Sequence, residues 1–448
     1  MLHPDAASAT ISSLVERAKR AGADAADAIY VGNLSSSVQV RDGATEDVSR
    51  SESEAVGLRL FVGQRSASAS TSDLSDDALE TLCERVAAMA REAPEDPYAG
   101  LVAAEYLASS PFPDLDGWDP AEPGPPELRE RALAAEAAAM AVPGAAKSNG
   151  CGAGVSAATV SIATSEGFAG GYRLSGHSCS AGVIAGEGST MQRDHAWHSS
   201  RHLGGLETSG DIGRKAAQRA VSRVGSTKIV PGTMPILFEP RVASSLLGHL
   251  AGAISGTSIA RKSSFLLDAL GERIFAEGIM ILDDPLRPRG LRSRGFDGEG
   301  LPVRPMAIVD DGRLTTWLAE SASARQLGIA PTGHASRGIG GSPSAGPSNF
   351  SLGNGKRSVA SILADIGRAI IVTELIGQGV NGVTGDYSRG AAGFLVERGE
   401  IVGPVSEITI ASNLKQMFAT LEPADDLEYR TGVDSPSVLI PEMTVGSA

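Results

Sequence analysis

The chain has 448 residues, of which 42% are hydrophobic and 21% are charged, a composition typical of globular domains. Its net charge of −14 repels phosphate backbones and disfavours nucleic acid as a partner. The cysteines Cys83, Cys151 and Cys179 are scattered and form no CxxC pair, which is typical of a reducing compartment. With no signal-like start and no long apolar stretch, the sequence predicts a cytoplasmic protein without membrane contact.

The N-terminal region mixes helical and extended patterns. Apolar residues at helical spacing predict helices at residues 11–21 and 72–91. Short alternating stretches predict strands at residues 28–31, 37–40 and 55–61. We therefore expect a small N-terminal α/β domain at residues 1–95. A Pro- and Gly-rich connector and an Ala/Glu-rich helix follow at residues 96–141.

Residues 142–226 are predicted to form a central antiparallel domain. Segments rich in Ser, Thr, Val and Gly alternate there and are separated by short turns. The expected strands are residues 157–163, 175–184 and 189–199. Polar alternation implies one face on a core and one face in water. A helix at residues 211–224 closes this domain.

Residues 227–448 are predicted to form the C-terminal domain. Closely spaced turn signals predict a large, mostly antiparallel sheet with helices. The expected helices are residues 242–254, 359–366 and 414–419. A Gly/Ser/Pro-rich stretch at residues 336–355 is interpreted as an ordered or gating loop. The predicted fold class is therefore α+β.

Several long motifs occur in order along the chain. They read VQVRDG at 38–43, GSPSAGPSN at 341–349, GVNGVTGDYSRGAAGF at 379–394, ERGEI at 397–401, EITIA at 407–411 and MTVG at 443–446. Together they resemble the signature stretches of the TldD/PmbA family, in particular its PmbA (TldE) branch. The resemblance runs along nearly the whole chain. It implies a relative of metallopeptidases.

The catalytic branch of that family carries His-Glu-x-x-x-His on a helix, where two imidazoles bind zinc and the carboxylate serves as a base. The similar helix here reads LLGHLAGA at residues 246–253. Aligned without a gap, Gly248 and Ala253 replace the two histidines and His249 replaces the glutamate. Glycine and alanine have no donor atom, and no cysteine follows Cys179 to supply the late cysteine ligand of the catalytic branch. The sequence thus predicts a degenerate site that binds no metal and has no intact catalytic residue.

Two groups of residues remain as candidates for substrate or partner contact. His249 is either a core histidine on an apolar helix or a peptide contact in a relic cleft. Asp386, Tyr387 and Arg389 lie in the most family-specific motif, which is either a contact loop or a turn whose aspartate caps its own backbone.

A second histidine cluster comprises His195, His198 and His202. We interpret its surroundings as a strand, on which His195 and His198 point to opposite faces. His198 and His202 would share a face but stand roughly 13 Å apart, too far for one metal ion. The role of these histidines stays open, and metal binding here is the minor alternative.

The resemblance implies a PmbA/TldE-like, non-catalytic subunit of a TldD/TldE-type metalloprotease. Its partner would be a TldD-like chain that holds the zinc, and its substrates would be small or unfolded peptides; a homodimer is a further option. One alternative is a non-proteolytic regulatory protein, since the family also carries the label of a DNA gyrase modulator. Another is a hydrolase with a site rebuilt around His195, His198 or Asp386.

Overall fold

The computed structural model describes residues 1–447 and confirms the α+β class with mostly antiparallel sheets. The N-terminal half is built on one six-stranded antiparallel sheet in the order β3-β2-β1-β4-β5-β6. Its strands are β1 (Ala25–Arg41), β2 (Ala44–Val62), β3 (Arg65–Thr71), β4 (Ala145–Thr164), β5 (Ala169–Ala185) and β6 (Gln192–Ser200). The first and third segments of the chain therefore share a single sheet, with β1 between β2 and β4. The domain boundaries expected from the sequence stay a prediction.

The long strands differ from the short ones expected. Residues 28–31 and 37–40 belong to one continuous strand, β1, because the polar residues between them, such as Ser35 and Ser36, pair with both neighbouring strands. Side chains at alternate positions of β1 enter two separate hydrophobic clusters: Ala26, Ala28 and Tyr30 in one, Val38 and Val40 in the other. Both clusters thus lie on the same face of the sheet.

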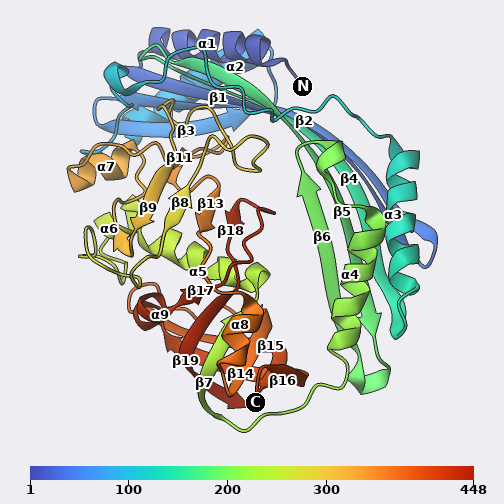
Figure 1. Ribbon diagram of the computed structural model, residues 1–448. Helices are drawn as coiled ribbons and strands as arrows, with labels where there is room; N and C mark the ends of the chain where they lie inside the picture. The colour runs from blue at the N-terminus through green and yellow to red at the C-terminus, as the bar shows by residue number, and fades with distance from the viewer. Residues whose placement is uncertain (448) are drawn as a thin grey trace.

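Two helix pairs cover that face. The pair α1 (Pro4–Arg20) and α2 (Asp76–Glu92) packs on the first cluster, and the pair α3 (Pro125–Met140) and α4 (Ser209–Ser222) packs on the second. The sequence predicted all four helices, although α1 begins earlier, at Pro4, and α2 begins later, at Asp76. Figure 1 shows the strands spanning the distance between the two pairs, with the C-terminal half on the other side of the sheet.

The C-terminal half contains a closed barrel. Its strands are β7 (Gly232–Phe238), β14 (Arg368–Ile376), β15 (Asp386–Glu397), β16 (Glu400–Asn413) and β19 (Val438–Ser447). They pair in the order β16-β15-β14-β7-β19, and a further pairing between β16 and β19 closes the ring. All contacts are antiparallel except the one between β7 and β14.

A second sheet of short strands has the order β10-β9-β8-β13-β18. Its strands are β8 (Ile281–Asp283), β9 (Met306–Asp310), β10 (Arg313–Leu314), β13 (Phe350–Leu352) and β18 (Val433–Asp434). Two-residue strands β11 (Ala335–Ser336) and β12 (Ser344–Ala345) pair with each other, and β17 (Glu422–Pro423) pairs with β19. The helices are α5 (Pro240–Ala253), α6 (Gly256–Ala260), α7 (Ser321–Leu327), α8 (Val359–Ala364) and α9 (Leu414–Thr420). Barrel, second sheet and α5 share one large hydrophobic core.

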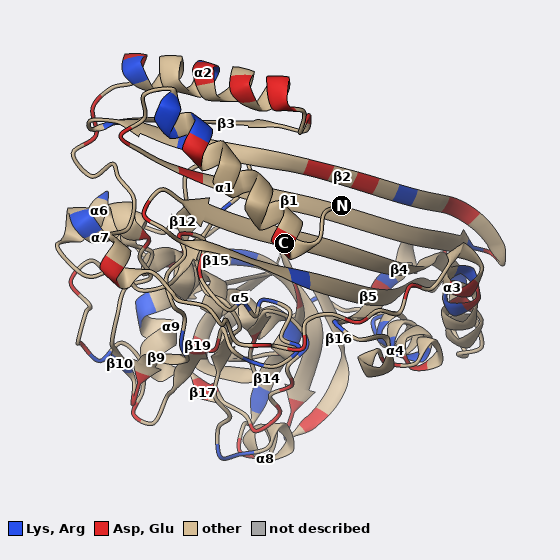
Figure 2. Ribbon diagram, turned by 90° about the horizontal axis from the view of Figure 1, so that it is seen from above, with Lys and Arg blue, Asp and Glu red and all other residues tan. Residues whose placement is uncertain are grey.

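The Gly/Ser/Pro-rich segment 336–355, expected to be an ordered or gating loop, is ordered and contains the short strands β12 and β13. Arg337 forms an ion pair with Asp27 on β1, and Ser348 donates to both oxygens of Asp283. Figure 2 shows the N-terminal sheet from above, running across the C-terminal half. Within residues 1–447 no helix combines the length and the apolar character that a membrane crossing needs.

Candidate functional site

Helix α5 carries the positions singled out by the sequence. Pro240 occupies its first turn, where a missing N–H costs no hydrogen bond. Its apolar side chains Val242, Ala243, Leu246, Leu247 and Leu250 recur at helical spacing and are buried in the C-terminal core. This strong apolar face fixes the rotation of the helix about its axis.

Gly248 and Ala253 lie on different sides of α5. Gly248 is exposed, and an added β-carbon would meet no atom within 4 Å, whereas Ala253 is 6% exposed and belongs to the core. Five residues along a helix turn the side chain by roughly 140°. These two positions therefore do not converge on one point, and neither residue has a donor atom.

His249 lies between these positions and faces two residues of β15. Its ring meets that of Tyr387 edge-on, with 6.0 Å between ring centroids. Burial lowers the pKa of His249, and the nearby charge of Arg389 lowers this pKa further. Burial also raises the pKa of Tyr387 to about 12. At neutral pH the group thus consists of a neutral imidazole, a protonated phenol and a guanidinium.

The zinc ion implied by the metallopeptidase resemblance does not fit these residues. Catalytic zinc takes three protein ligands, usually imidazole, carboxylate or thiolate. Around His249 the neighbours are instead a phenol that stays protonated and a positive charge that repels a cation. Within residues 1–447, no three or more His, Cys, Asp and Glu side chains gather closely enough to hold a metal ion.

Asp386 is exposed and is held within its own turn. Its carboxylate accepts hydrogen bonds from the Thr384 hydroxyl at 2.6 Å and from the Asn413 side-chain amide at 3.1 Å. The bond from Thr384 contributes most to lowering the pKa of Asp386, followed by the bond from Asn413. Asp386 and Tyr387 also line an open groove of about 780 Å³, together with residues 378–382. The motif combines a locally satisfied aspartate with a buried tyrosine.

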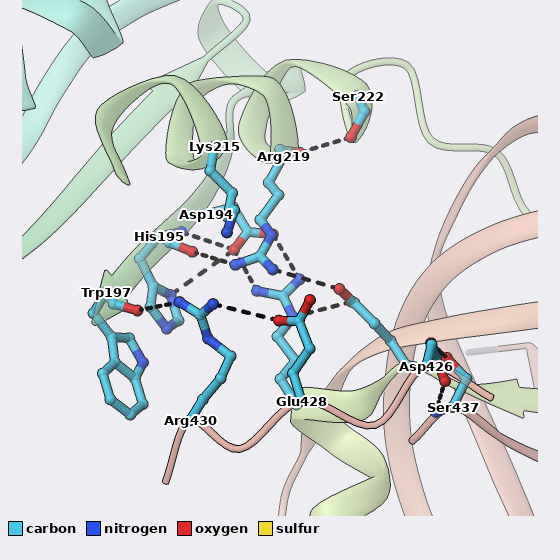
Figure 3. Close-up of polar contacts among 12 residues, drawn as sticks. Asp194, His195, Trp197, Lys215, Arg219, Ser222, Asp426, Glu428, Arg430 and Ser437 are labelled. Carbon is cyan, nitrogen blue, oxygen red and sulfur yellow. Dashed lines mark hydrogen bonds and ion pairs between the residues drawn. The ribbon is translucent and has the colours of Figure 1, made fainter. Parts of the chain in front are cut away.

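The first turns of α5 border a much larger cavity that the sequence did not predict. It has a volume of about 1090 Å³ and lies between β6 and α4 on one side and β14, α5 and the loop before β18 on the other. Figure 3 shows His195, Trp197, Lys215, Arg219, Glu428 and Arg430 gathered around Asp194. Six arginine or lysine and six aspartate or glutamate side chains line this cavity.

Asp194 on β6 is the centre of this charged lining and is only 5% exposed. Arg241 on α5 donates to both of its oxygens at 2.7 and 3.1 Å, and Arg223 after α4 donates at 3.3 Å. Burial by itself raises the pKa of Asp194, but the bonds and charges of the two arginines outweigh it and lower the pKa. The carboxylate therefore stays ionised and links the two halves of the chain.

Further ion pairs cross the same cavity. Arg223 also pairs with Glu374 on β14, and Arg219 pairs with Glu239. Arg430 pairs with Glu207 at 2.5 Å and donates to the Trp197 carbonyl. Partners in these pairs are up to 223 residues apart, so the sequence offered no local signal for them. The charged residues of the edge strand β6 are the one sequence feature that could have suggested this charged lining.

The three histidines of the second cluster are separated in the structure. His195 is exposed on β6, while His198 accepts a hydrogen bond from the Glu207 N–H at 3.0 Å. His202 follows the strand and contacts the Asp116 carbonyl at 2.9 Å. The strand expected at residues 189–199 is found at residues 192–200, and His202 lies beyond its end rather than on one face of it with His198. Of the three, only His195 lines the large cavity.

Comparisons with known proteins agree with this architecture. They define the class of the chain as a metallopeptidase-family protein with three matched domains. Residues 26–90 match the model of PmbA/TldA metallopeptidase domain 1, residues 118–224 that of the central domain and residues 231–447 that of the C-terminal domain. The fold is similar to that of a Bacteroides thetaiotaomicron protein described as a candidate modulator of DNA gyrase, with a TM-score of 0.91, 26% identity and 98% of both chains covered.

Relatives with similar sequences identify the family within this class. The chain is 40% identical to the metalloprotease PmbA of Escherichia coli O157:H7, over 91% of this chain and 89% of that protein. It is 36% identical to a PmbA homologue of Haemophilus influenzae, over 97% of this chain and 95% of the relative. The fold also matches TldE from Thermococcus kodakarensis, with a TM-score of 0.87, 21% identity and coverage of 98% and 100%. The chain therefore belongs to the PmbA/TldD family, as its motifs predicted.

Proposed function

We propose that the chain is the PmbA/TldE-like subunit of a TldD/TldE-type metalloprotease complex that acts on small or unfolded peptides. In this role it does not hold the catalytic zinc, which belongs to a TldD-like partner. The observation that carries the proposal is the environment of His249 on α5. This neutral imidazole faces Tyr387 and Arg389. In the ungapped alignment of the motif, Gly248, His249 and Ala253 stand in place of the residues with which the family's catalytic branch holds its metal.

Relatives support the partnership. A metalloprotease TldD homologue from Buchnera aphidicola is 22% identical over 52% of this chain, so TldD-like and PmbA-like chains share ancestry. Antiparallel sheet edges are suited to bind extended peptides as an added strand. The buried cysteines Cys83, Cys151 and Cys179 are free, which suits the cytoplasmic location expected for such a complex.

The test is co-expression with a relative from the same genome that keeps His-Glu-x-x-x-His. We expect the two chains to copurify, with zinc and chelator-sensitive cleavage of an unstructured peptide found only when both are present. A matched complex whose partner has both zinc-binding histidines replaced by alanine should still assemble but should lose zinc and activity.

Two outcomes would contradict the proposal. Stoichiometric zinc and chelator-sensitive cleavage by the isolated chain would show a site rebuilt within it. Capture of DNA gyrase by the chain, without any zinc-bearing relative and without peptidase activity, would favour the regulatory alternative.

A further inference from the structure

Three neighbouring side chains between α5 and β15 have buried polar atoms without a partner. Within residues 1–447, His249 Nε2, the Tyr387 hydroxyl and Arg389 Nε make no hydrogen bond. Tyr387 and Arg389 are two residues apart on β15 and so lie on the same face of the strand. The great majority of buried polar groups in proteins have a hydrogen-bond partner. Three unpaired groups gathered between α5 and β15 therefore indicate a bound species.

The charge of the group indicates that this species is an anion. Arg389 is half-buried and forms no ion pair with any carboxylate in the part of the chain that the structure describes. Its charge acts on both His249 and Tyr387. Guanidinium and protonated phenol both donate hydrogen bonds, and imidazole donates from one nitrogen. Donors thus outnumber acceptors, and the only formal charge among the three is positive.

Open space borders both elements that carry the group. Gly248 and Gly252 are exposed on the same helix, and an added β-carbon at either would meet nothing within 4 Å. Tyr387 lines the groove of about 780 Å³ together with residues 378–382 and Asp386, while His249 and Arg389 are not among its lining residues. A planar carboxylate matches the fork of a guanidinium, with its two oxygens accepting parallel hydrogen bonds.

We propose that His249, Tyr387 and Arg389 form a carboxylate-binding site that holds a peptide by its C-terminal carboxylate or by an acidic side chain. Arg389 donates to the carboxylate oxygens, and Tyr387 and His249 donate from the buried side. The carboxylate chemistry stands on these three side chains alone. Only the choice of a peptide as its bearer rests on the function proposed above.

Binding can be tested on the full chain without a partner, so that this result is independent of copurification. The chain is labelled with ¹⁵N-histidine, and the His249 resonance is assigned by comparison with H249Q. It is then titrated with three probes: N-acetyl-trialanine with a free carboxylate, the same peptide as its C-terminal amide, and N-acetyl-Ala-Asp-Ala amide. We expect a carboxylate-bearing probe to shift the Nε2 resonance and the trialanine amide to leave it in place. A response to only one of the two acids identifies the source of the carboxylate.

Three variants separate binding from a structural role. Arg389→Gln should weaken binding of the responding acid at least tenfold, and Arg389→Lys should restore part of it. Tyr387→Phe should weaken binding several-fold without lowering the melting temperature of the free chain, because the hydroxyl has no partner to lose. Circular dichroism confirms that each variant is folded.

The proposal is overturned if no acid shifts the His249 resonance, since the three atoms would then be satisfied by ordered water only. Equal binding of the free acid and its amide would also overturn it, because the groove would then recognise the peptide backbone. Unchanged affinity in both Arg389→Gln and Tyr387→Phe would place any binding elsewhere on the chain.

Discussion

The Arg337 guanidinium lies 2.7 Å from the carboxylate of Asp27, a residue 310 positions earlier in the chain. Arg59 on β2 donates to the same carboxylate at 2.5 to 3.2 Å. All three side chains are at most 7% exposed. One buried carboxylate thus holds two arginines and fastens the loop after β11 to the N-terminal sheet.

Replacing Asp27 by asparagine should lower the free energy of unfolding by about 3–5 kcal/mol, because two buried guanidinium groups lose their nearest counter-charge and only Glu299, 3.8 Å from Arg59, remains close. Urea denaturation followed by circular dichroism measures the change. Asp47→Asn on the exposed part of β2 is the matched control and should stay within about 0.5 kcal/mol of the parent chain. Equal stability of the two variants would contradict the assigned role of Asp27.

Gly57 on β2 lies directly beneath the same loop. An added β-carbon would approach the Ile339 carbonyl oxygen to 1.8 Å, so Gly57→Ala must displace backbone. We expect a loss of about 1–3 kcal/mol, as for other overpacked sites. In Gly403→Ala, by contrast, the added methyl meets no atom within 4 Å, and its unfolding midpoint should match that of the parent chain.

Asp194 should contribute to stability through the contact between the two halves. Asp194→Asn removes the shared charge partner of Arg223 and Arg241, at a cost of about 3 kcal/mol for a largely buried cluster. Faster hydrogen exchange in β6 and at the start of α5 would locate the effect. Glu428→Gln tests a 73% exposed partner of Arg430 in the same cavity and should cost no more than about 1 kcal/mol.

His249 should make the stability of the chain depend on pH. Its folded pKa is lowered, chiefly by burial and then by Arg389, so the unfolded state takes up a proton first as pH falls through about 6.5. Stability should therefore fall on acidification below this pH, by at most about 1.4 kcal/mol per pH unit and by less for this half-buried ring. His249→Gln should remove this component when unfolding is compared at pH 7.5 and 5.5. An identical pH dependence in both chains would show that the imidazole is not involved.

Local patterns predicted most elements but not their extent. The amphipathic helices and the central strands were recognised because side-chain burial repeats at 3.6 or 2 residues. The polar stretch between residues 31 and 37 concealed the continuity of β1, since strand pairing there uses backbone groups that any residue supplies. Barrel closure by β16 and β19 is likewise a backbone relationship between distant segments.

The site was predictable only where it follows a motif. His249, Tyr387 and Arg389 stand in or beside family-like stretches, and the structure brings these three together. Asp194, Arg241 and Arg223 stand in no motif, and their contact depends on how β6, α4 and α5 pack. Residues joined only by tertiary structure leave no spacing in the sequence to recognise.

Strand β1 has a consequence for dissecting the molecule. It hydrogen-bonds to β4 from Asp27 to Val40, although the matched family models place these strands in different domains. A fragment ending near residue 95 would lose β4, the partner of fourteen consecutive β1 residues. It would expose a long unpaired strand edge that favours aggregation. The first two matched family domains are therefore not suited to separate expression. The smallest workable truncation keeps residues 1–224 together.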